Sequence, residues 1–123
     1  MSTRPHLSGR RAEDLAADFL RSVGCEILTR NYRRRLGELD IVVRAGDVLV
    51  VVEVRTRASS AYGGAAASVT RAKQRRIARA ASALLQQRAD LAQLPVRFDV
   101  IVVTDPHGAS PGIEWIRHAF EAA

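Results

Sequence analysis

The sequence predicts an α/β fold in which a mixed central sheet is flanked by helices. Apolar residues recur at helical spacing in two segments, and apolar segments with the character of strands lie between and after them. The predicted order is a helix, three strands, a helix and a strand, an αβββαβ core. A length of 123 residues suits one domain with a real core, so we expect residues 1–123 to form a single domain with residues 1–7 as a loose arm.

The first helix and strand follow from spacing and composition. Apolar side chains at helical spacing predict a helix from Ser8 onward, and Gly24 is suited to cap its C-terminus. Residues 26–32 mix β-branched, aromatic and polar side chains, which indicates a first, peripheral strand.

The second half of the chain supplies a helix and one or two strands. Thr70 can cap a helix that continues to about Arg88, and residues 96–103 predict the fourth strand. Asp99 in this strand is expected to pair locally rather than to bind a metal. Residues 113–120 indicate a short last strand or a strand-like tail.

The second and third strands form a hairpin over residues 37–57. Gly46-Asp47 is a favoured two-residue turn, with Gly first suiting a type II′ turn. If Ala45 faces Val48 across it, Asp40 lies opposite Glu53 on the same face, whereas a three-residue loop would separate them. Arg55 shares the face of Glu53 by the two-residue period of a strand.

Two facing carboxylates in an apolar sheet repel each other and are poorly solvated. Either one takes up a proton or a cation sits between them, and Mg²⁺ would suit such a pair of oxygen ligands. The alternative is that Asp40 and Glu53 lie on the solvated face of a half-exposed hairpin, paired with nearby arginines.

The charge balance favours an anionic partner. Lys and Arg number 19 against 13 Asp and Glu, a net charge of +6, which is typical of proteins that meet nucleic acid or an anionic surface. Lys73 is the only lysine, and arginine suits bidentate phosphate contacts. A compositional bias of the source genome would produce the same preference for arginine.

Two segments concentrate this charge and are the candidate nucleic-acid contacts. The first is a run of three arginines that could grip phosphates or simply keep a loop soluble. The second is the start of the second helix, where five cations without an acid repel each other and favour a polyanionic partner. The residues are Arg33, Arg34 and Arg35 in the run, and Arg71, Lys73, Arg75, Arg76 and Arg79 in the helix.

Several features of the sequence indicate the cellular location of the protein. Cys25 is alone, which rules out an intrachain disulfide, and we find neither a membrane-spanning apolar run nor a signal peptide. We therefore expect a cytoplasmic protein without a membrane partner. Residues 58–69 connect the hairpin to the second helix, and Tyr62-Gly63-Gly64 within them is either a substrate-facing loop or a plain connector.

The order and spacing of several short motifs resemble the YraN-like family of small bacterial proteins. That family is placed in the PD-(D/E)xK nuclease superfamily alongside archaeal Holliday-junction resolvases. The match spans residues 9 to about 120. Its pieces are Gly9, Ala12-Glu13, Asn31-Tyr32, Gly37-Glu38-Leu39-Asp40, residues 52–57, Tyr62-Gly63, Lys73 and residues 97–100.

The resemblance implies a restriction-endonuclease-like fold and roles for the matched residues. Asp40 and Glu53 would hold Mg²⁺ or Mn²⁺, and Glu13 would complete the outer surroundings of the metal. Arg55 stands where the superfamily expects a catalytic lysine. Arginine stays charged, so it could position a phosphate but could not handle a proton, and turnover could be low or absent.

These features predict a metal-dependent DNA endonuclease-like protein that hydrolyses phosphodiesters, with branched DNA as a candidate substrate. The rivals are a DNA- or RNA-binding module on a nuclease fold that cleaves weakly or not at all, and a basic interaction protein for RNA or a ribosomal complex. One active site cuts one strand, so symmetric cleavage of a junction would require a homodimer.

Overall fold

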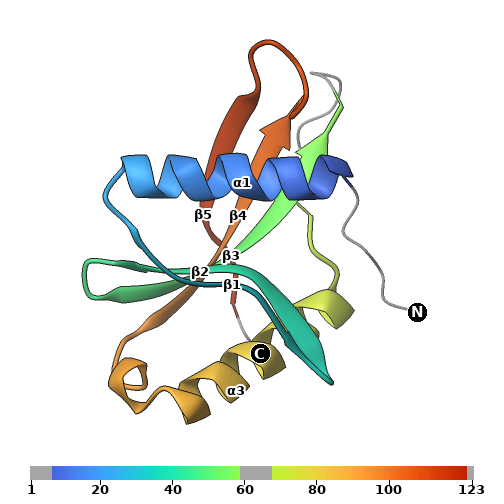
Figure 1. Ribbon diagram of the computed structural model, residues 1–123. Helices are drawn as coiled ribbons and strands as arrows, with labels where there is room; N and C mark the ends of the chain where they lie inside the picture. The colour runs from blue at the N-terminus through green and yellow to red at the C-terminus, as the bar shows by residue number, and fades with distance from the viewer. Residues whose placement is uncertain (1–6, 59–67, 122–123) are drawn as a thin grey trace.

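Two helices enclose a five-stranded sheet in the computed structural model, which describes residues 7–58 and 68–121 (Figure 1). The strand order is β1-β2-β3-β4-β5, and all neighbours are antiparallel except β3 and β4, which are parallel. The elements are α1 Leu7–Ser22, β1 Glu26–Arg34, β2 Gly37–Ala45, β3 Val48–Arg57, α3 Arg71–Gln87, the 3-10 turn η1 Ala89–Leu91, β4 Val96–Thr104 and β5 Gly112–Phe120.

The predicted α/β fold class and the order of its elements are confirmed. The mixed sheet between two helices is compatible with the restriction-endonuclease-like fold. The last segment, for which the sequence left two readings open, is a nine-residue strand paired with β4. Tyr62-Gly63-Gly64 and most of the expected N-terminal arm lie outside the described residues, although α1 already includes Leu7.

Helix ends follow the local sequence. Gly24 has a φ of +93°, and the N–H groups of Gly24 and Cys25 donate to the carbonyls of Arg21 and Leu20, a Schellman arrangement that ends α1. At the start of α3, the hydroxyl of Thr70 accepts the Lys73 N–H at 3.1 Å, which confirms the predicted cap.

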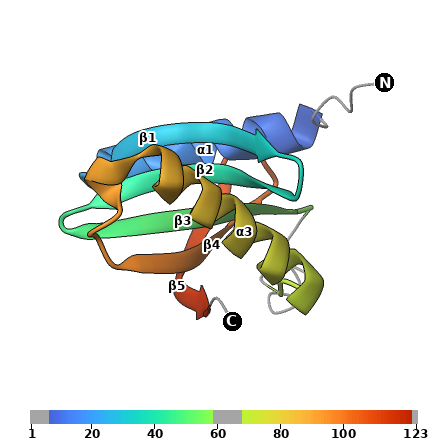
Figure 2. The same ribbon diagram turned by 90° about the horizontal axis from the view of Figure 1, so that it is seen from below.

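Two apolar cores lie on the two faces of the sheet. In Figure 2, α3 lies in front of the strands and α1 behind them. The alternation of β2 and β3 divides their side chains, so that Val43 and Val50 pack under α1 while Val42 and Val51 pack under α3. Both faces of the central strands are therefore covered, and any charged group there needs a partner.

Asp99 is a buried carboxylate that is fully satisfied. Its side chain is 0% exposed and accepts two hydrogen bonds from Arg97 at 2.9 Å, one from the indole N–H of Trp115 at 2.8 Å and one from the His118 N–H at 2.9 Å. Four donors offset the cost of burying the charge. The expectation that Asp99 pairs locally is confirmed, and β5 is tied to β4 through it.

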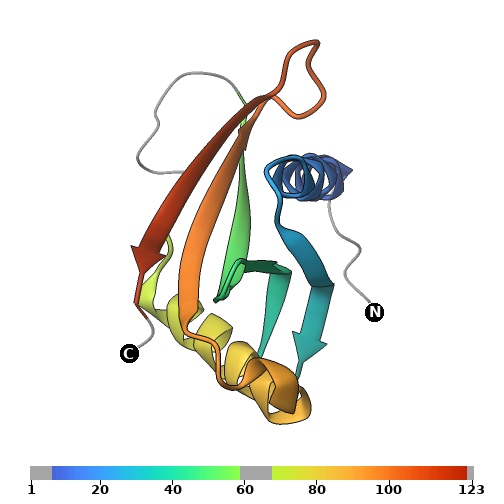
Figure 3. The ribbon, with the colours of Figure 1, turned by 90° about the vertical axis from the view of Figure 1, so that its left-hand side faces the viewer.

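The tip of the β1–β2 hairpin lies directly against α3. A Cβ atom added at Gly37 would sit 2.2 Å from the carbonyl oxygen of Arg76, so the glycine permits backbone to approach backbone. Figure 3 shows the β1–β2 pair turning away from β3, β4 and β5 toward this helix. The contact fixes the hairpin tip beside the cationic half of α3.

Gly37→Ala should therefore destabilise the fold by about 1–3 kcal/mol, because the hairpin or the helix must move to admit the methyl group. Urea unfolding followed by circular dichroism measures this. Gly9→Ala is the matched control, since no atom lies within 4 Å of the added carbon, and it should be neutral or stabilise by up to about 1 kcal/mol. Equal effects of the two substitutions would contradict the close approach at Gly37.

Candidate metal and nucleic-acid site

Asp40 and Glu53 meet where β2 separates from β3. The ladder between these strands runs from Ala45–Val48 to Ile41–Val52, so the next residues in register are Asp40 and Glu53. Beyond the ladder, the Val54 N–H donates to Oδ2 of Asp40 at 2.9 Å. The register predicted from the Gly46-Asp47 turn is confirmed, and Gly46 has the positive φ of +61° that the turn requires.

The strand pattern breaks at Asp40 on its other side as well. Pairing with β1 passes from Arg30–Ile41 to Tyr32–Leu39, and Asn31, between them, has a φ of +53°. Leu39 packs on the α3 side although Ile41, two residues on, packs under α1. Asp40 is thus the point at which β2, still paired with β1, parts from β3, which leaves its carboxylate at a fork between strands.

Burial and charge make this pair electrostatically unfavourable. Glu53 is 4% exposed. Burial, the negative charge of Glu53 and a hydrogen bond between the two side chains raise the pKa of Asp40 to about 7, against the lowering effects of the Val54 N–H and Lys73. Asp99 is buried with four donors, whereas the described residues offer the Asp40–Glu53 pair one backbone N–H and one ammonium group.

Lys73 supplies that ammonium group. Its Nζ lies 3.1 Å from Oε2 of Glu53 and its side chain is 32% exposed. The sequence predicted only a phosphate contact for Lys73. Its position four residues before the buried Ile77 was the available signal, because residues at that spacing share a helix face and point toward the sheet.

The side chain of Arg55 is bonded away from the Asp40–Glu53 pair. Its guanidinium donates to the carbonyl oxygen of Ser68, and in the described part of the chain no ion pair joins it to Asp40 or Glu53. The cation that faces Glu53 therefore comes from α3 and not from Arg55 on β3.

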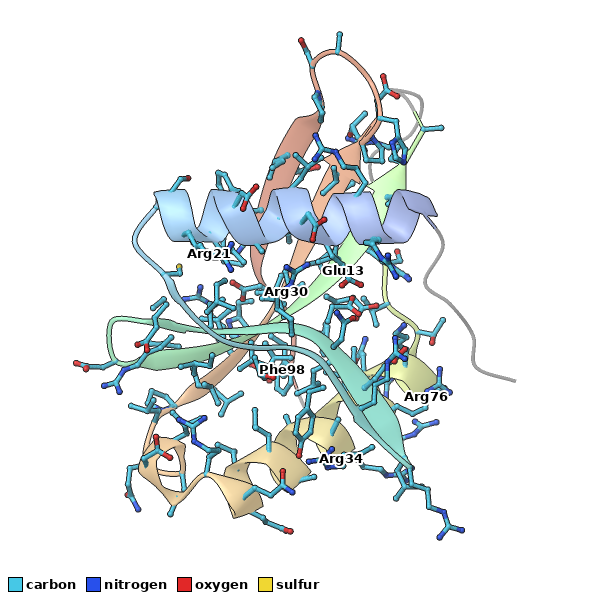
Figure 4. The ribbon with its side chains drawn as sticks, in the orientation of Figure 1. Glu13, Arg21, Arg30, Arg34, Arg76 and Phe98 are labelled. Carbon is cyan, nitrogen blue, oxygen red and sulfur yellow. The ribbon has the colours of Figure 1, made fainter. Side chains whose placement is uncertain are left out.

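Glu13 approaches Asp40 from α1. Burial raises the pKa of Glu13, the charge of Asp40 raises it further, and Arg30 together with a hydrogen bond from Asn31 lowers it. Figure 4 places Glu13 on the side of α1 that faces the strands, near Arg30. Asn31 is a residue whose role the sequence reasoning missed, because a positive φ inside a strand leaves no periodic signal.

A metal ion would find one buried carboxylate, Glu53, and one half-buried carboxylate, Asp40, rather than a complete set of ligands. Within residues 7–58 and 68–121, no three His, Cys, Asp or Glu side chains are grouped closely enough to hold a metal ion. Mg²⁺ usually binds through one or two carboxylates and keeps several waters. Asp40 and Glu53 fit that requirement, since the ionised pair carries two negative charges against the single positive charge of Lys73. Glu13 lies outside the pair as a third acid.

The two predicted cationic segments come together in one pocket of about 440 Å³, which we call the arginine pocket. One wall is the β1–β2 hairpin tip and the other is the first half of α3. Six of the eight predicted nucleic-acid contacts line it: Arg33, Arg34, Arg35, Lys73, Arg76 and Arg79.

Some of these arginines already have partners. Arg33 lies 3.3 Å from Glu38, and Arg34 stacks 4.1 Å from the centre of the Tyr32 ring and donates to Gln87 at 2.7 Å. For Arg35, Arg76 and Arg79, all exposed, the described residues supply no ion pair. These three are the groups that an anion would meet first.

The two remaining predicted contacts lie outside the arginine pocket. Arg75 lines a shallow depression on the outer side of α3, and Arg71 is exposed at the start of that helix. Arg33 also lines a second pocket of about 570 Å³ beside Glu13, Arg30 and Asn31. The arginine pocket and the surroundings of Glu13 therefore adjoin at Arg33.

Fold and site together define an α/β protein with two facing carboxylates at a fork in its sheet, next to a cationic pocket. Among the described residues no helix is long and apolar enough to cross a membrane. The model of the uncharacterised protein family UPF0102 matches residues 12–103, and the chain belongs to this family. UPF0102 is the YraN-like family, so the predicted resemblance is confirmed.

Relatives in several bacteria match over nearly their whole length. A UPF0102 protein of Alkalilimnicola ehrlichii is 47% identical over 119 residues, 96% of this chain and 90% of its own. One of Stutzerimonas stutzeri is 46% identical, with 94% and 95% of the two chains covered. One of Pseudomonas aeruginosa is 45% identical, with 93% and 92% covered.

The raised pKa of Asp40 predicts a stability difference that depends on pH. The folded state holds this proton more tightly than the unfolded state, whose pKa is about 3.9, so stability is lost as the pH rises from about 4 to about 7. Asp40→Asn removes the ionisable carboxyl group of Asp40, so the free energy of unfolding of the variant should not fall in this way. The free energy of unfolding of the variant minus that of wild type should therefore be about 1–3 kcal/mol larger at about pH 8 than at about pH 5.

Thermal unfolding at the two pH values measures this difference. Asp47→Asn, on the same hairpin at a side chain that is 99% exposed, is the control and should show no such dependence. If Asp40→Asn behaves like the control, Asp40 is not forced against Glu53.

Proposed function

We propose that this protein is a nucleic-acid-binding, metal-dependent endonuclease that hydrolyses DNA phosphodiesters, with branched DNA as the candidate substrate. The observation that carries the proposal is the half-buried carboxylate of Asp40 facing the buried carboxylate of Glu53 beside the arginine pocket. Two poorly solvated carboxylates favour a bound cation between them, and a cationic pocket next to them favours a polyanion.

Different residues of the chain would bind the metal, position its ligand and contact the nucleic acid. Asp40 and Glu53 would hold Mg²⁺ or Mn²⁺, which when bound activates water and stabilises charge on a phosphate. The Val54 N–H holds the Asp40 carboxylate in place, and the proton on Asp40 must leave before that carboxylate can serve as a ligand. Exposed Arg35, Arg76 and Arg79 contact the backbone of the nucleic acid and fix its position relative to the pair.

One observation favours a second candidate, a DNA-binding module that does not cleave. Arg55 occupies the motif position and is bonded to Ser68, so the usual catalytic lysine is missing from its strand. Such a module would bind DNA with a salt-sensitive affinity and would use the arginine pocket in the same way.

Incubation with Mn²⁺ or Mg²⁺ and a panel of duplex, flap and four-way junction DNA tests the proposal. We expect cleavage of at least one substrate, and Asp40→Ala or Glu53→Ala should lower the rate by at least about 100-fold, because each removes a metal ligand. Product formation on denaturing gels gives the rates.

Asp47→Ala is the matched control, since it removes an exposed carboxylate from the same hairpin and should cut at the wild-type rate. Cleavage that persists in Asp40→Ala, or a panel that remains uncut with both metals, would refute the catalytic assignment. The second outcome together with salt-sensitive binding would support the module.

DNA binding itself should depend on the arginine pocket. Arg76→Met should weaken binding and reduce the slope of log affinity against log salt by about 1, since one phosphate contact is lost. Fluorescence anisotropy over a range of salt concentrations measures both quantities.

Arg21→Met controls for net charge, because Arg21 lies on α1 and pairs with Asp18 on the opposite side of the sheet from α3 (Figure 4). Equal salt slopes for the two variants would place the nucleic acid elsewhere. Competition by structured RNA in the same assay separates DNA from RNA as the preferred partner, and light scattering with junction DNA tests for the homodimer.

A further inference from the structure

Lys73 belongs to both halves of the proposed site. Its ammonium lies 3.1 Å from Oε2 of Glu53, and its side chain also lines the arginine pocket with Arg33, Arg76 and Arg79. No other residue that lines that pocket forms an ion pair with Glu53 or Asp40 among the described residues.

The ammonium group competes with a divalent ion. Glu53 has a 5% exposed side chain, and Lys73 is the cation that now offsets its charge. A metal held between Asp40 and Glu53 would bring two further positive charges close to this ammonium. Repulsion between them must either weaken metal binding or move Lys73 away from Glu53.

The arginine pocket is where Lys73 can go. Lysine carries a compact charge on a flexible four-carbon stem, so its ammonium can turn from one partner to another without moving the helix. The pocket already contains several arginines, which repel an incoming ammonium while no anion is present. Phosphates bound in the pocket would reverse this preference.

Arg55 takes no part in this competition. It lies two residues beyond Glu53 on β3, and its guanidinium is bonded to the carbonyl of Ser68. Removal of Lys73 would therefore leave Glu53 without its cation.

We propose that Lys73 couples the metal site to the arginine pocket. Lys73 pairs with Glu53 in the free protein and with a DNA phosphate when a divalent ion occupies the Asp40–Glu53 pair, so that metal and DNA each strengthen the binding of the other. This coupling rests on the proposed metal and nucleic-acid sites but not on cleavage. By linkage, the factor by which DNA tightens metal binding equals the factor by which metal tightens DNA binding.

Calorimetric titration of the full-length protein with Mn²⁺ in the absence of DNA is the first arm. Lys73→Met should bind Mn²⁺ about tenfold more tightly than wild type, because the competing cation is gone. Lys73→Gln serves as a second variant with a polar side chain and should behave alike. Arg79→Met is the matched control, since it removes a cation that lines the same pocket without touching Glu53, and it should stay within about twofold of wild type.

Anisotropy of a labelled DNA duplex with hydrolysis-resistant phosphorothioate linkages, with and without Mn²⁺, is the second arm. Mn²⁺ should tighten DNA binding by wild type about tenfold or more, and this factor should fall at least about fivefold in Lys73→Met. Arg79→Met should lower DNA affinity but retain the factor.

The outcomes separate this inference from the nuclease proposal. Unchanged or weaker Mn²⁺ binding by both Lys73 variants overturns the coupling even if wild type cleaves DNA. A wild type that shows the coupling but cuts no substrate retains this inference and loses the nuclease. Failure of wild type to bind Mn²⁺ overturns the coupling together with the metal site.

Discussion

The close approach of the carboxylates of Asp40 and Glu53, which repel each other, is the constraint on which the rest of the structure depends. Two carboxylates on one face of a covered sheet can ionise together only if a cation approaches them. The chain meets this demand in three ways: a pKa of about 7 at Asp40, an N–H donated by Val54 and an ammonium group supplied by α3. Each of these compensates only part of the negative charge of the pair, so a divalent ion could still bind there.

The surrounding elements hold the pair in place and present it to solvent. The turn at Gly46-Asp47 sets the register, and the break at Asn31 and Asp40 lies where β2 parts from β3 while it stays paired with β1. Gly37 allows the hairpin tip to touch α3, which brings the arginines of both elements around one pocket. The same contacts therefore stabilise the fold and form the proposed site, because the strand that carries Asp40 also contributes to a wall of the arginine pocket.

Much of this arrangement could be predicted from local rules. Strand periodicity and one turn were enough to place Asp40 opposite Glu53, and the cap at Thr70 and the stop at Gly24 follow from residue chemistry. Contacts between elements could not be predicted in this way. The apolar face of the second helix predicts that Lys73 points toward the sheet, but it does not predict which strand Lys73 contacts. The hydrogen bond from Arg55 to Ser68 depends on how the chain returns from β3 to α3. The positive φ of Asn31 arises from the divergence of strands, which is a property of the assembled sheet.

Anomalous scattering from a crystal soaked with Mn²⁺ tests the central claim most directly. We expect one peak between the carboxylates of Asp40 and Glu53, with the ammonium of Lys73 turned away from Glu53. A crystal in which Lys73 remains paired with Glu53 and Mn²⁺ is found only elsewhere, or not at all, would contradict it.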